Sequence, residues 1–233
     1  MTNKEKNLCT ICARGGSKGV KNKNLKKING ISLLERSINQ AKKTKIFDKI
    51  VLSTDSNEII NLSKKLNIDF IIRRSKRLSN DKASKLDVIK DSLYKSEKNF
   101  NYKFDNIIDI DLTTPLREIK DIKNAFSYFK KNNYNNLLSV CKANKNPYFN
   151  IIEVRNNKTQ LVKNTKNFTT RQSSPKVFEA NSAIYIWKRN FLINSFKIVY
   201  PKTGLYIMPR ERSIDIDDKF DLSLVKLLIG NKI

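Results

Sequence analysis

The sequence predicts an α/β fold: one Rossmann-like domain, spanning residues 1–233, around a mostly parallel, doubly wound sheet. Short apolar runs alternate with helical patterns up to about residue 140, which is typical of βαβ units. The first apolar run also leads directly into a glycine-rich loop, as the first strand of a nucleotide-binding sheet does. A chain of 233 residues is long enough for one such domain with a sizeable core, and short for two.

The first elements follow a strand–helix rhythm. Residues 8–13 form an apolar run that predicts a buried strand, and Ser32 can cap a helix of about three turns whose apolar residues recur at helical spacing. A second strand over 49–53 precedes Ser56, which can cap a helix that ends near Leu66.

The same alternation continues through the middle of the chain. We expect strands at residues 69–72, 104–110 and 136–141, separated by helices at 84–96 and 121–130. Because helices separate consecutive strands, most strands should run parallel to their neighbours.

The pattern changes between residues 142 and 170. Two short strand-like stretches flank the polar segment 155–158, which predicts a β-hairpin inserted into the domain. An inserted hairpin often serves dimerisation, so we expect a homodimer. The sheet then resumes with strands at 183–187 and near 200–208, and a helix over 218–228 closes the chain.

The composition is strongly basic, with 47 Lys and Arg against 22 Asp and Glu and a formal charge of +25. Such an excess attracts nucleic acid, anionic membranes or anionic small molecules. The lysines are scattered and accompany no nucleic-acid module, so we expect neither nucleic acid nor membrane as a partner; a basic nucleic-acid-binding protein is the weaker alternative. No apolar run approaches the ~20 residues of a membrane helix, and no secretory signal is evident, which favours a cytoplasmic location.

Residues that bind metals or act as bases are few in kind. The chain has no histidine, so any metal should be a hard cation held by carboxylates. Cys9, Cys12 and Cys141 match neither a disulfide framework nor a zinc site. We interpret them as small buried residues, with a redox pair of Cys9 and Cys12 as the alternative.

Two segments carry most of the chemistry. In residues 14–19, glycines let backbone N–H groups approach a polyphosphate while an arginine and a lysine supply positive charge. In residues 214–218, an extended chain points Asp215 and Asp217 the same way, which suits a hard cation such as Mg²⁺. Taken alone, the first segment could be a basic surface turn and the second a solvated strand face.

Motifs along nearly the whole chain resemble the acylneuraminate cytidylyltransferases, also called CMP-sialic acid synthetases. The glycine-rich loop, followed by Lys-x-Lys-Asn, is similar to their CTP-binding signature, although Cys12 stands where proline is common. Further segments resemble the family's motifs in order: Ser53-Thr-Asp-Ser56, Arg73-Arg-Ser-x-x-Leu-Ser-x-Asp81, Asp111-Leu-Thr-Thr-Pro-Leu-Arg117, Thr170-Arg-Gln-Ser-Ser-Pro175, Glu179-Ala-Asn-Ser-Ala-Ile-Tyr185 and Met208-Pro-x-Glu-Arg-Ser-Ile-Asp-Ile-Asp217.

The resemblance implies an enzyme that transfers CMP from CTP to an acidic sugar, with Mg²⁺ as cofactor. The implied nucleotide-binding residues are Arg14, Gly15, Gly16, Ser17, Lys18, Lys23, Asn24, Ser53 and Arg73. The implied sugar-binding residues are Asp111, Thr113, Arg171, Gln172, Asn181 and Tyr185, and Arg171 is the candidate for the sugar carboxylate. Asp215 and Asp217 would hold the metal, and Arg14, Lys18 and Asp217 would be catalytic.

Two departures leave the acceptor open. Asp111 stands where the sialic acid enzymes often carry glutamine, which replaces an amide that can donate by a carboxylate that only accepts. Ser182 replaces a usual glycine. The acceptor could be an N-acylneuraminate or a legionaminic or pseudaminic relative. A CMP-Kdo synthetase-like or other sugar nucleotidyltransferase, and a homologue that only binds, are alternatives; the proton acceptor is Asp217 or a metal-bound hydroxide.

Overall fold

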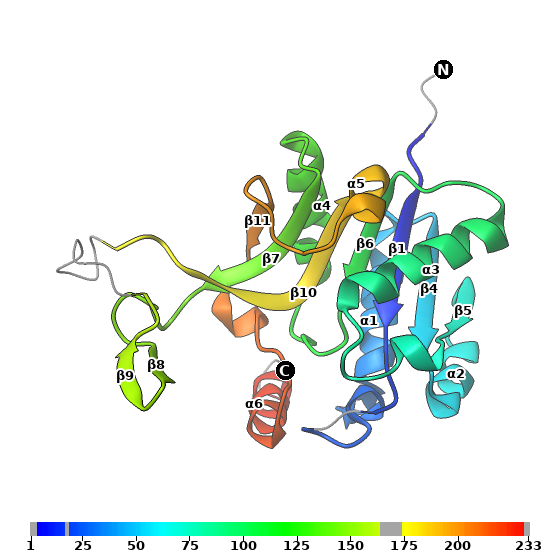
Figure 1. Cartoon of the computed structure of the whole chain (residues 1–233). Coiled ribbons are helices and arrows are strands. Elements are labelled where there is room, and N and C mark those ends of the chain that lie inside the picture. Colours follow the sequence, from blue (N-terminus) through cyan, green and yellow to red (C-terminus); the bar gives the residue numbers. More distant parts are fainter. Residues whose placement is uncertain (1–3, 17–18, 164–173, 231–233) are drawn as a thin grey trace.

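The computed structural model describes residues 4–16, 19–163 and 174–230, which form three layers, with helices on both faces of a seven-stranded sheet (Figure 1). The strand order is β11-β7-β10-β6-β1-β4-β5. Six strands run in one direction, and β10 alone is antiparallel to its neighbours β6 and β7. The predicted mostly parallel fold is therefore confirmed. The strands are β1 (Asn7–Cys12), β4 (Lys49–Thr54), β5 (Phe70–Arg73), β6 (Asn106–Ile110), β7 (Asn136–Lys142), β10 (Phe178–Lys188) and β11 (Gly204–Ile207).

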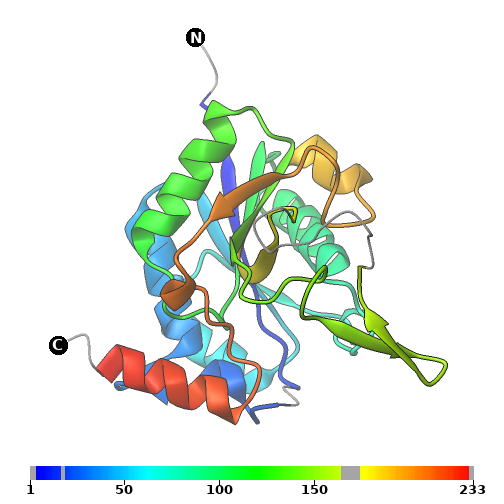
Figure 2. The same cartoon turned by 90° about the vertical axis from the view of Figure 1, so that its left-hand side faces the viewer.

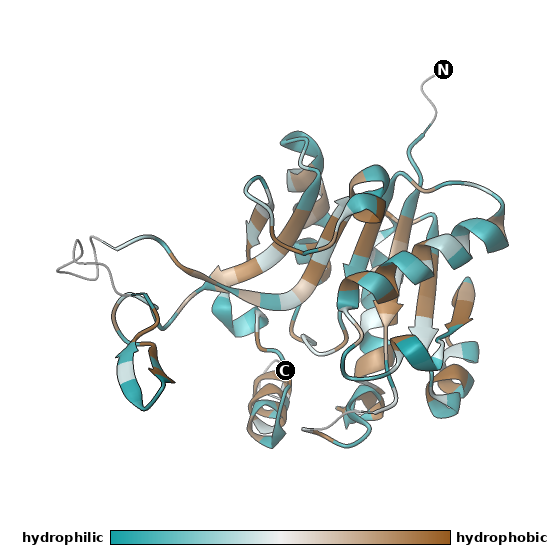
Figure 3. Cartoon of the chain, viewed as in Figure 1, coloured by the Kyte–Doolittle hydropathy of each residue, from teal (hydrophilic) through white to brown (hydrophobic). Residues whose placement is uncertain are grey.

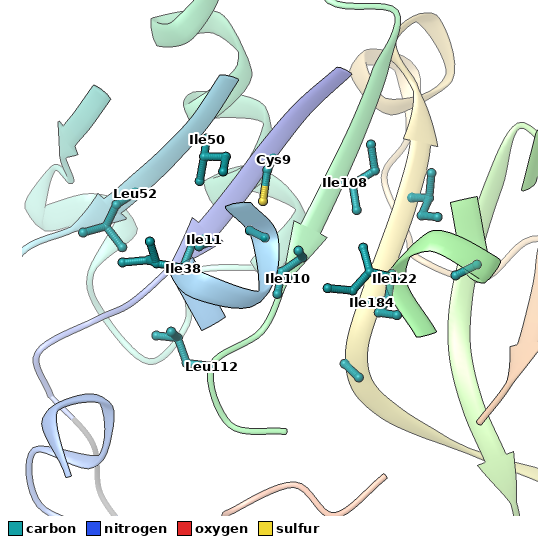
Figure 4. Packing of buried hydrophobic residues seen from close by; sticks show 14 of the residues in the cluster. Cys9, Ile11, Ile38, Ile50, Leu52, Ile108, Ile110, Leu112, Ile122 and Ile184 are labelled. Carbon is teal, nitrogen blue, oxygen red and sulfur yellow. The ribbon is translucent and has the colours of Figure 1, made fainter. Parts of the chain in front are cut away.

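Alternation along the strands sends side chains to two separate cores. On β1, Cys9 and Ile11 pack with Ile108 and Ile110 of β6 (Figure 4) against one set of helices. That set comprises α1 (Leu33–Thr44), α2 (Asn57–Lys64) and α4 (Ile119–Lys131). Leu8 and its β6 neighbours face the opposite side, which α3 (Lys85–Phe100) and α5 (Arg189–Asn194) cover. Figure 3 shows the apolar residues concentrated along the central strands.

Serine side chains fix where several helices begin. The Oγ atoms of Ser32, Ser56 and Ser84 accept hydrogen bonds from the backbone N–H groups three residues on, at 3.1, 3.4 and 3.1 Å. The caps predicted at Ser32 and Ser56 are confirmed. Between β1 and α1 lie the short elements η1 (Lys23–Leu25), β2 (Lys27–Ile28) and β3 (Ile31–Ser32), and η2 (Lys76–Leu78) precedes α3.

The predicted hairpin consists of β8 (Ile152–Arg155) and β9 (Lys158–Leu161), which pair only with each other. Asn156 and Asn157 both have positive φ, at 51° and 58°, as a tight two-residue hairpin turn requires. The hairpin projects away from the main sheet (Figures 1 and 2). Its role in dimerisation stays a prediction.

The C-terminal part closes one end of the sheet. The segment η3 (Arg210–Arg212) and helix α6 (Lys219–Gly230) follow β11, and Ile216 and Val225 are fully buried in a third small core with Val20 and Leu116. The N-terminal extension of β10 was not predicted, because Glu179 and Ala180 pair with β7 and remain exposed. Helix α5, of six residues, was not predicted either. No helix in the described ranges has both the length and the apolarity needed to cross a membrane.

Candidate active site

A cavity of about 380 Å³ opens at the carboxyl ends of β1 and β6. Ligands of doubly wound sheets bind at this edge because the connecting loops diverge there. Most of the lining consists of residues that the sequence singled out. The lining residues are Cys12, Arg14, Gly19, Lys23, Asn24, Asp111, Thr113, Asp215 and Asp217.

The loop after β1 is held in shape by its own side chains. Asn24 is 7% exposed, and its Nδ2 donates to the Arg14 carbonyl oxygen at 3.0 Å. The Arg14 guanidinium pairs with Asp81 at 2.6 Å. The Gly15 N–H donates to Asp55 at 2.8 Å and so is taken by the protein, whereas a Cβ at Gly16 would meet nothing within 4 Å. Predicted residues Ser17 and Lys18 lie outside the described residues.

The segment that carries the two aspartates is pinned against this loop. A Cβ at Gly19 would lie 1.9 Å from the Asp217 carbonyl oxygen, so only glycine permits the approach. Lys23 Nζ donates to the Ile216 carbonyl oxygen and lies 3.6 Å from an Asp217 carboxylate oxygen. From the other side, Ile216 N–H donates to the Thr113 carbonyl oxygen at 2.8 Å. Loop and aspartate segment therefore form one unit.

The carboxylates in the cavity suit a hard cation. Burial raises the pKa of Asp215, and the charges of Asp111 and Asp217 raise it further against hydrogen bonding from Thr113. Asp215 Oδ1 is buried without a hydrogen-bond partner among the described residues, while the Asp217 side chain is 81% exposed. A divalent cation would relieve both the repulsion and the orphaned oxygen, so these residues fit Mg²⁺.

The described residues contain no group of three or more acidic or cysteine side chains close enough to enclose a metal. Mg²⁺ commonly uses one or two carboxylates and takes its other ligands from phosphates and water. Asp215 and Asp217 match that arrangement, and the substrate would supply the remaining oxygens.

Lys85, which the sequence analysis did not single out, contacts a residue that lines the cavity. It is the first residue of α3, and its Nζ lies 2.6 Å from Asp111 Oδ2 and 3.2 Å from Asp109 Oδ2. Nζ also lies 4.3 Å from the centroid of the Tyr185 ring. Burial opposes the Lys85 charge, but Asp111 and Asp109 more than offset it and raise its pKa well above the ordinary value.

Arg73 and Arg74 leave β5 in opposite directions. Predicted Arg73 is exposed, and its guanidinium donates to Asn57 at 2.7 Å. Arg74 is 8% exposed and donates to the backbone and side-chain oxygens of Ser53 at 2.8 and 3.2 Å. Ser53 itself is buried, at 1% exposure. The arginine that turns into the protein is therefore Arg74, and Arg73 lies at the surface.

Asn181 and Tyr185 lie behind the cavity lining, because β10 turns both side chains inward. Asn181 is 3% exposed; its Oδ1 accepts from Ser139 Oγ at 2.6 Å, and its Nδ2 donates to Ser213 Oγ at 2.8 Å. It thus anchors the segment just before Asp215. Of the other predicted sugar-binding residues, Asp111 and Thr113 line the cavity, and Arg171 and Gln172 lie outside the described residues.

The three cysteines differ in burial, and alternation along β1 places Cys9 and Cys12 on opposite faces of the sheet. Cys9 and Cys141 are buried, at 0% and 4% exposure, whereas half-buried Cys12 lines the cavity. Burial and the Asp109 charge raise the pKa of the Cys12 thiol well above its usual value, which keeps it protonated. Cys9 belongs to the core on the other face of the sheet, so the two thiols point apart.

A Rossmann-like sheet with a glycine loop and paired aspartates at its carboxyl edge defines a nucleotide-binding enzyme. The family model described as "Cytidylyltransferase" matches residues 8–225, nearly the whole chain. The protein belongs to this family of nucleotidyltransferases, which confirms the class that the sequence motifs predicted.

Named relatives support the same assignment. The chain is 46% identical over 225 residues to a Campylobacter coli protein called "Post-translational flagellin modification protein B", covering 97% of this chain and 95% of the relative. It is 45% identical over 226 residues to the "CMP-N,N'-diacetyllegionaminic acid synthase" of Campylobacter jejuni, with coverage of 97% and 95%. A "Pseudaminic acid cytidylyltransferase" of the same species is 30% identical over 224 residues, covering 96% of each chain.

Solved structures share the fold at low sequence identity. CMP:2-keto-3-deoxy-manno-octonic acid synthetase, solved with CTP, superimposes with a TM-score of 0.71 and 14% identity over 98% of this chain and 100% of that one. A 4-diphosphocytidyl-2C-methyl-D-erythritol synthase gives 0.70 and 12% with the same coverage. At these identities the likeness concerns the fold.

Proposed function

We propose that the protein transfers CMP from CTP to an acidic nine-carbon sugar and releases pyrophosphate. The observation that carries this proposal is that one cavity is lined by Arg14 and Gly19 of the basic glycine loop and by Asp215 and Asp217. Asp111 and Thr113 line the same cavity. The sugar that we favour is N,N'-diacetyllegionaminic acid, because the relative named for its activation is 45% identical over nearly the whole chain.

In the proposed reaction, the anomeric hydroxyl oxygen of the sugar attacks the α-phosphorus of CTP. A bond forms between that oxygen and phosphorus, the bond to the bridging oxygen of the β-phosphate breaks, and pyrophosphate leaves with the electron pair. The hydroxyl proton goes to a base, for which exposed Asp217 is the candidate on this chain. Little covalent work is asked of the protein, so alignment and charge dominate.

The chain's residues would divide the work by charge. Arg14 and Lys23 lie on the side of the glycine loop and would bind the triphosphate, with Lys18 added by resemblance. Asp215 and Asp217 would hold Mg²⁺, whose charge offsets that of the phosphate oxygens. Lys23 also supports Asp217 directly, at 3.6 Å, and so links nucleotide binding to the position of the metal ligands.

A homodimer is part of the proposal. Ile152 and Val154 alternate on β8 and are 62% and 71% exposed, so one face of the hairpin presents an unpaired apolar surface. A second copy of the chain would cover it. Light scattering should give the dimer mass for the wild type and a monomer for Val154→Asp; a monomeric wild type would refute this part. We place the protein in the cytoplasm, where CTP is available.

The test of the proposed function is pyrophosphate release with Mg²⁺ and a matrix of nucleotides and acceptors. CTP, ATP, GTP and UTP are each combined with N,N'-diacetyllegionaminic, pseudaminic, N-acetylneuraminic and Kdo acids. The proposal expects release with CTP and a nine-carbon acid. Release only with Kdo would favour the alternative acceptor, and release with no pair would refute the proposal.

A further inference from the structure

Lys85 occupies a position that its charge alone would disfavour. It is the first residue of α3, directly after the Ser84 cap, where the helix dipole repels a cation. Its ammonium is nevertheless held at the end of β6 by two carboxylates, at 2.6 Å from Asp111 and 3.2 Å from Asp109. Asp109 is itself fixed, because its Oδ1 accepts from Thr10 Oγ1 at 2.8 Å. The lysine is thus placed by several independent contacts.

Both members of the Lys85–Asp111 pair keep hydrogen-bonding capacity. Within the described residues, Lys85 Nζ makes one hydrogen bond, to Asp111 Oδ2, because the contact to Asp109 Oδ2 is an ion pair without hydrogen-bond geometry. An ammonium group has three N–H donors. Asp111 Oδ1 accepts from the N–H and hydroxyl of Thr113 at 3.1 and 2.9 Å, whereas Oδ2 accepts, in the described part of the chain, from Lys85 alone.

Nζ keeps donor capacity beyond its hydrogen bond to Asp111, and Oδ2 keeps acceptor capacity beyond its hydrogen bond from Lys85, next to the cavity that Asp111 lines. Because Nζ and Oδ2 are hydrogen-bonded to each other at 2.6 Å, one hydroxyl group that approaches the pair meets both a donor and an acceptor. A hydroxyl group can accept from the first and donate to the second, whereas an ether or carbonyl oxygen can only accept. The Lys85 side chain is 24% exposed and pairs with Asp111, which lines the cavity.

We propose that Lys85 and Asp111 together recognise one hydroxyl group of the acceptor sugar, Lys85 as donor and Asp111 as acceptor, and so determine which sugar is used. The inference rests on the proposed function and deepens it. It also accounts for the aspartate at position 111: an amide supplies a donor and an acceptor from one side chain, and here Lys85 supplies the donor that the aspartate lacks.

The test compares single-residue variants across acceptors that each lack one hydroxyl. Kinetics with CTP and Mg²⁺ are measured for the wild type, Lys85→Met and the control Lys95→Met, using the preferred acceptor and its 4-deoxy and 8-deoxy analogues. Lys95 lies on the same helix and pairs at 2.9 Å with Asp91, which does not line the cavity, whereas the partner of Lys85 does. Lys85→Met should raise the acceptor KM about 10- to 100-fold and leave the CTP KM unchanged.

One of the two deoxy analogues should bind the wild type as weakly as the preferred acceptor binds Lys85→Met. The KM of that analogue should not change in Lys85→Met, because the hydroxyl that Lys85 would bind is already missing. The double variant Lys85→Met/Asp111→Gln removes both charges and restores an amide, so it should recover acceptor binding relative to Lys85→Met. Recovery separates recognition from a folding defect. Equal losses for every analogue and for CTP would overturn the inference, as would a Lys85→Met enzyme that behaves like Lys95→Met. An inactive wild type would refute the proposed function as well.

Discussion

The backbones of Gly19 and Asp217, two residues that line the cavity, are in close contact. A Cβ added at Gly19 would lie 1.9 Å from the Asp217 carbonyl oxygen and 3.1 Å from its carbonyl carbon, and neither atom is a flexible side-chain end. The glycine loop can therefore pack against the aspartate segment because Gly19 has no side chain. This contact places the expected phosphate-binding loop next to the expected metal ligands.

Replacing Gly19 by alanine should separate these two segments. We expect Gly19→Ala to lower the melting temperature by several degrees, since forced overpacking costs about 1–3 kcal/mol, and to lower turnover strongly. Gly230→Ala is the matched control, because a Cβ there meets nothing within 4 Å. Thermal melting and pyrophosphate release measure both effects. A Gly19→Ala protein as active as the control would contradict the proposed link.

Replacing Asp215 by asparagine should lower activity without lowering stability. Asp215→Asn removes a negative charge that Asp111 and Asp217 oppose, so the variant should melt at the same or a higher temperature in buffer without Mg²⁺. Its turnover with Mg²⁺ should fall about 100-fold or more, because the variant lacks one carboxylate ligand of the metal that would stabilise the charge of the transition state. Asp91→Asn, which weakens a partly exposed ion pair within α3, is the matched control and should leave turnover unchanged. A variant that retains full turnover would exclude Asp215 as a metal ligand.

Ser182 has a left-handed backbone, with φ at 56°, inside the irregular part of β10. Because a Cβ is disfavoured there, Ser182→Gly should stabilise the protein by about 0.5–1 kcal/mol. Ser182→Ala keeps the Cβ and should bring no gain. Urea unfolding gives the comparison. If Ser182→Gly were less stable than the wild type, the 3.4 Å contact between the Tyr185 and Ser182 hydroxyls would outweigh the backbone strain.

The Lys85–Asp111 pair predicts an acid-sensitive contribution to stability. Burial alone would raise the pKa of Asp111, but Lys85 and Thr113 lower it from 3.8 to about 2. A lowered pKa means that the stabilisation is complete above the ordinary value and is lost as the pH falls toward 2. The difference in unfolding free energy between wild type and Asp111→Asn should be about 2 kcal/mol at pH 6 and shrink below pH 4. A difference independent of pH would show that the pair is not ionic.

The fold follows from local patterns, and the sequence therefore predicts it well. Capping serines and apolar periodicity are read within a few residues, and the β1 strand followed by its glycine loop is a continuous signal. The antiparallel direction of β10 cannot be predicted from local patterns. It depends on which strands pair across the sheet, and β10 pairs with residues of β6 that lie more than 70 positions earlier, such as Ile184 with Ile110.

The sequence singled out most of the residues that line the cavity, and it did not single out Lys85, whose contact with the cavity residue Asp111 joins two distant segments. Lys85 is one of 47 basic residues, and only its contact with Asp111, 26 positions away, distinguishes it from the solvated ones. The burial of Arg74 could have been predicted from the sequence. Alternation along β5 places Arg74 on the same face as buried Ile72, while Arg73 faces the other way. The resemblance to the family pointed to the pair but not to the inward member.

The proposed activity is the transfer of CMP from CTP to an acidic sugar at the cavity that Asp215 and Asp217 line. The most direct measurement is mass spectrometry of a reaction containing CTP, Mg²⁺ and N,N'-diacetyllegionaminic acid, run with wild type and with Asp217→Ala. We expect CMP-linked sugar and pyrophosphate in equal amounts from the wild type, and neither from the variant. Pyrophosphate without CMP-sugar, or equal product from both proteins, would contradict the account.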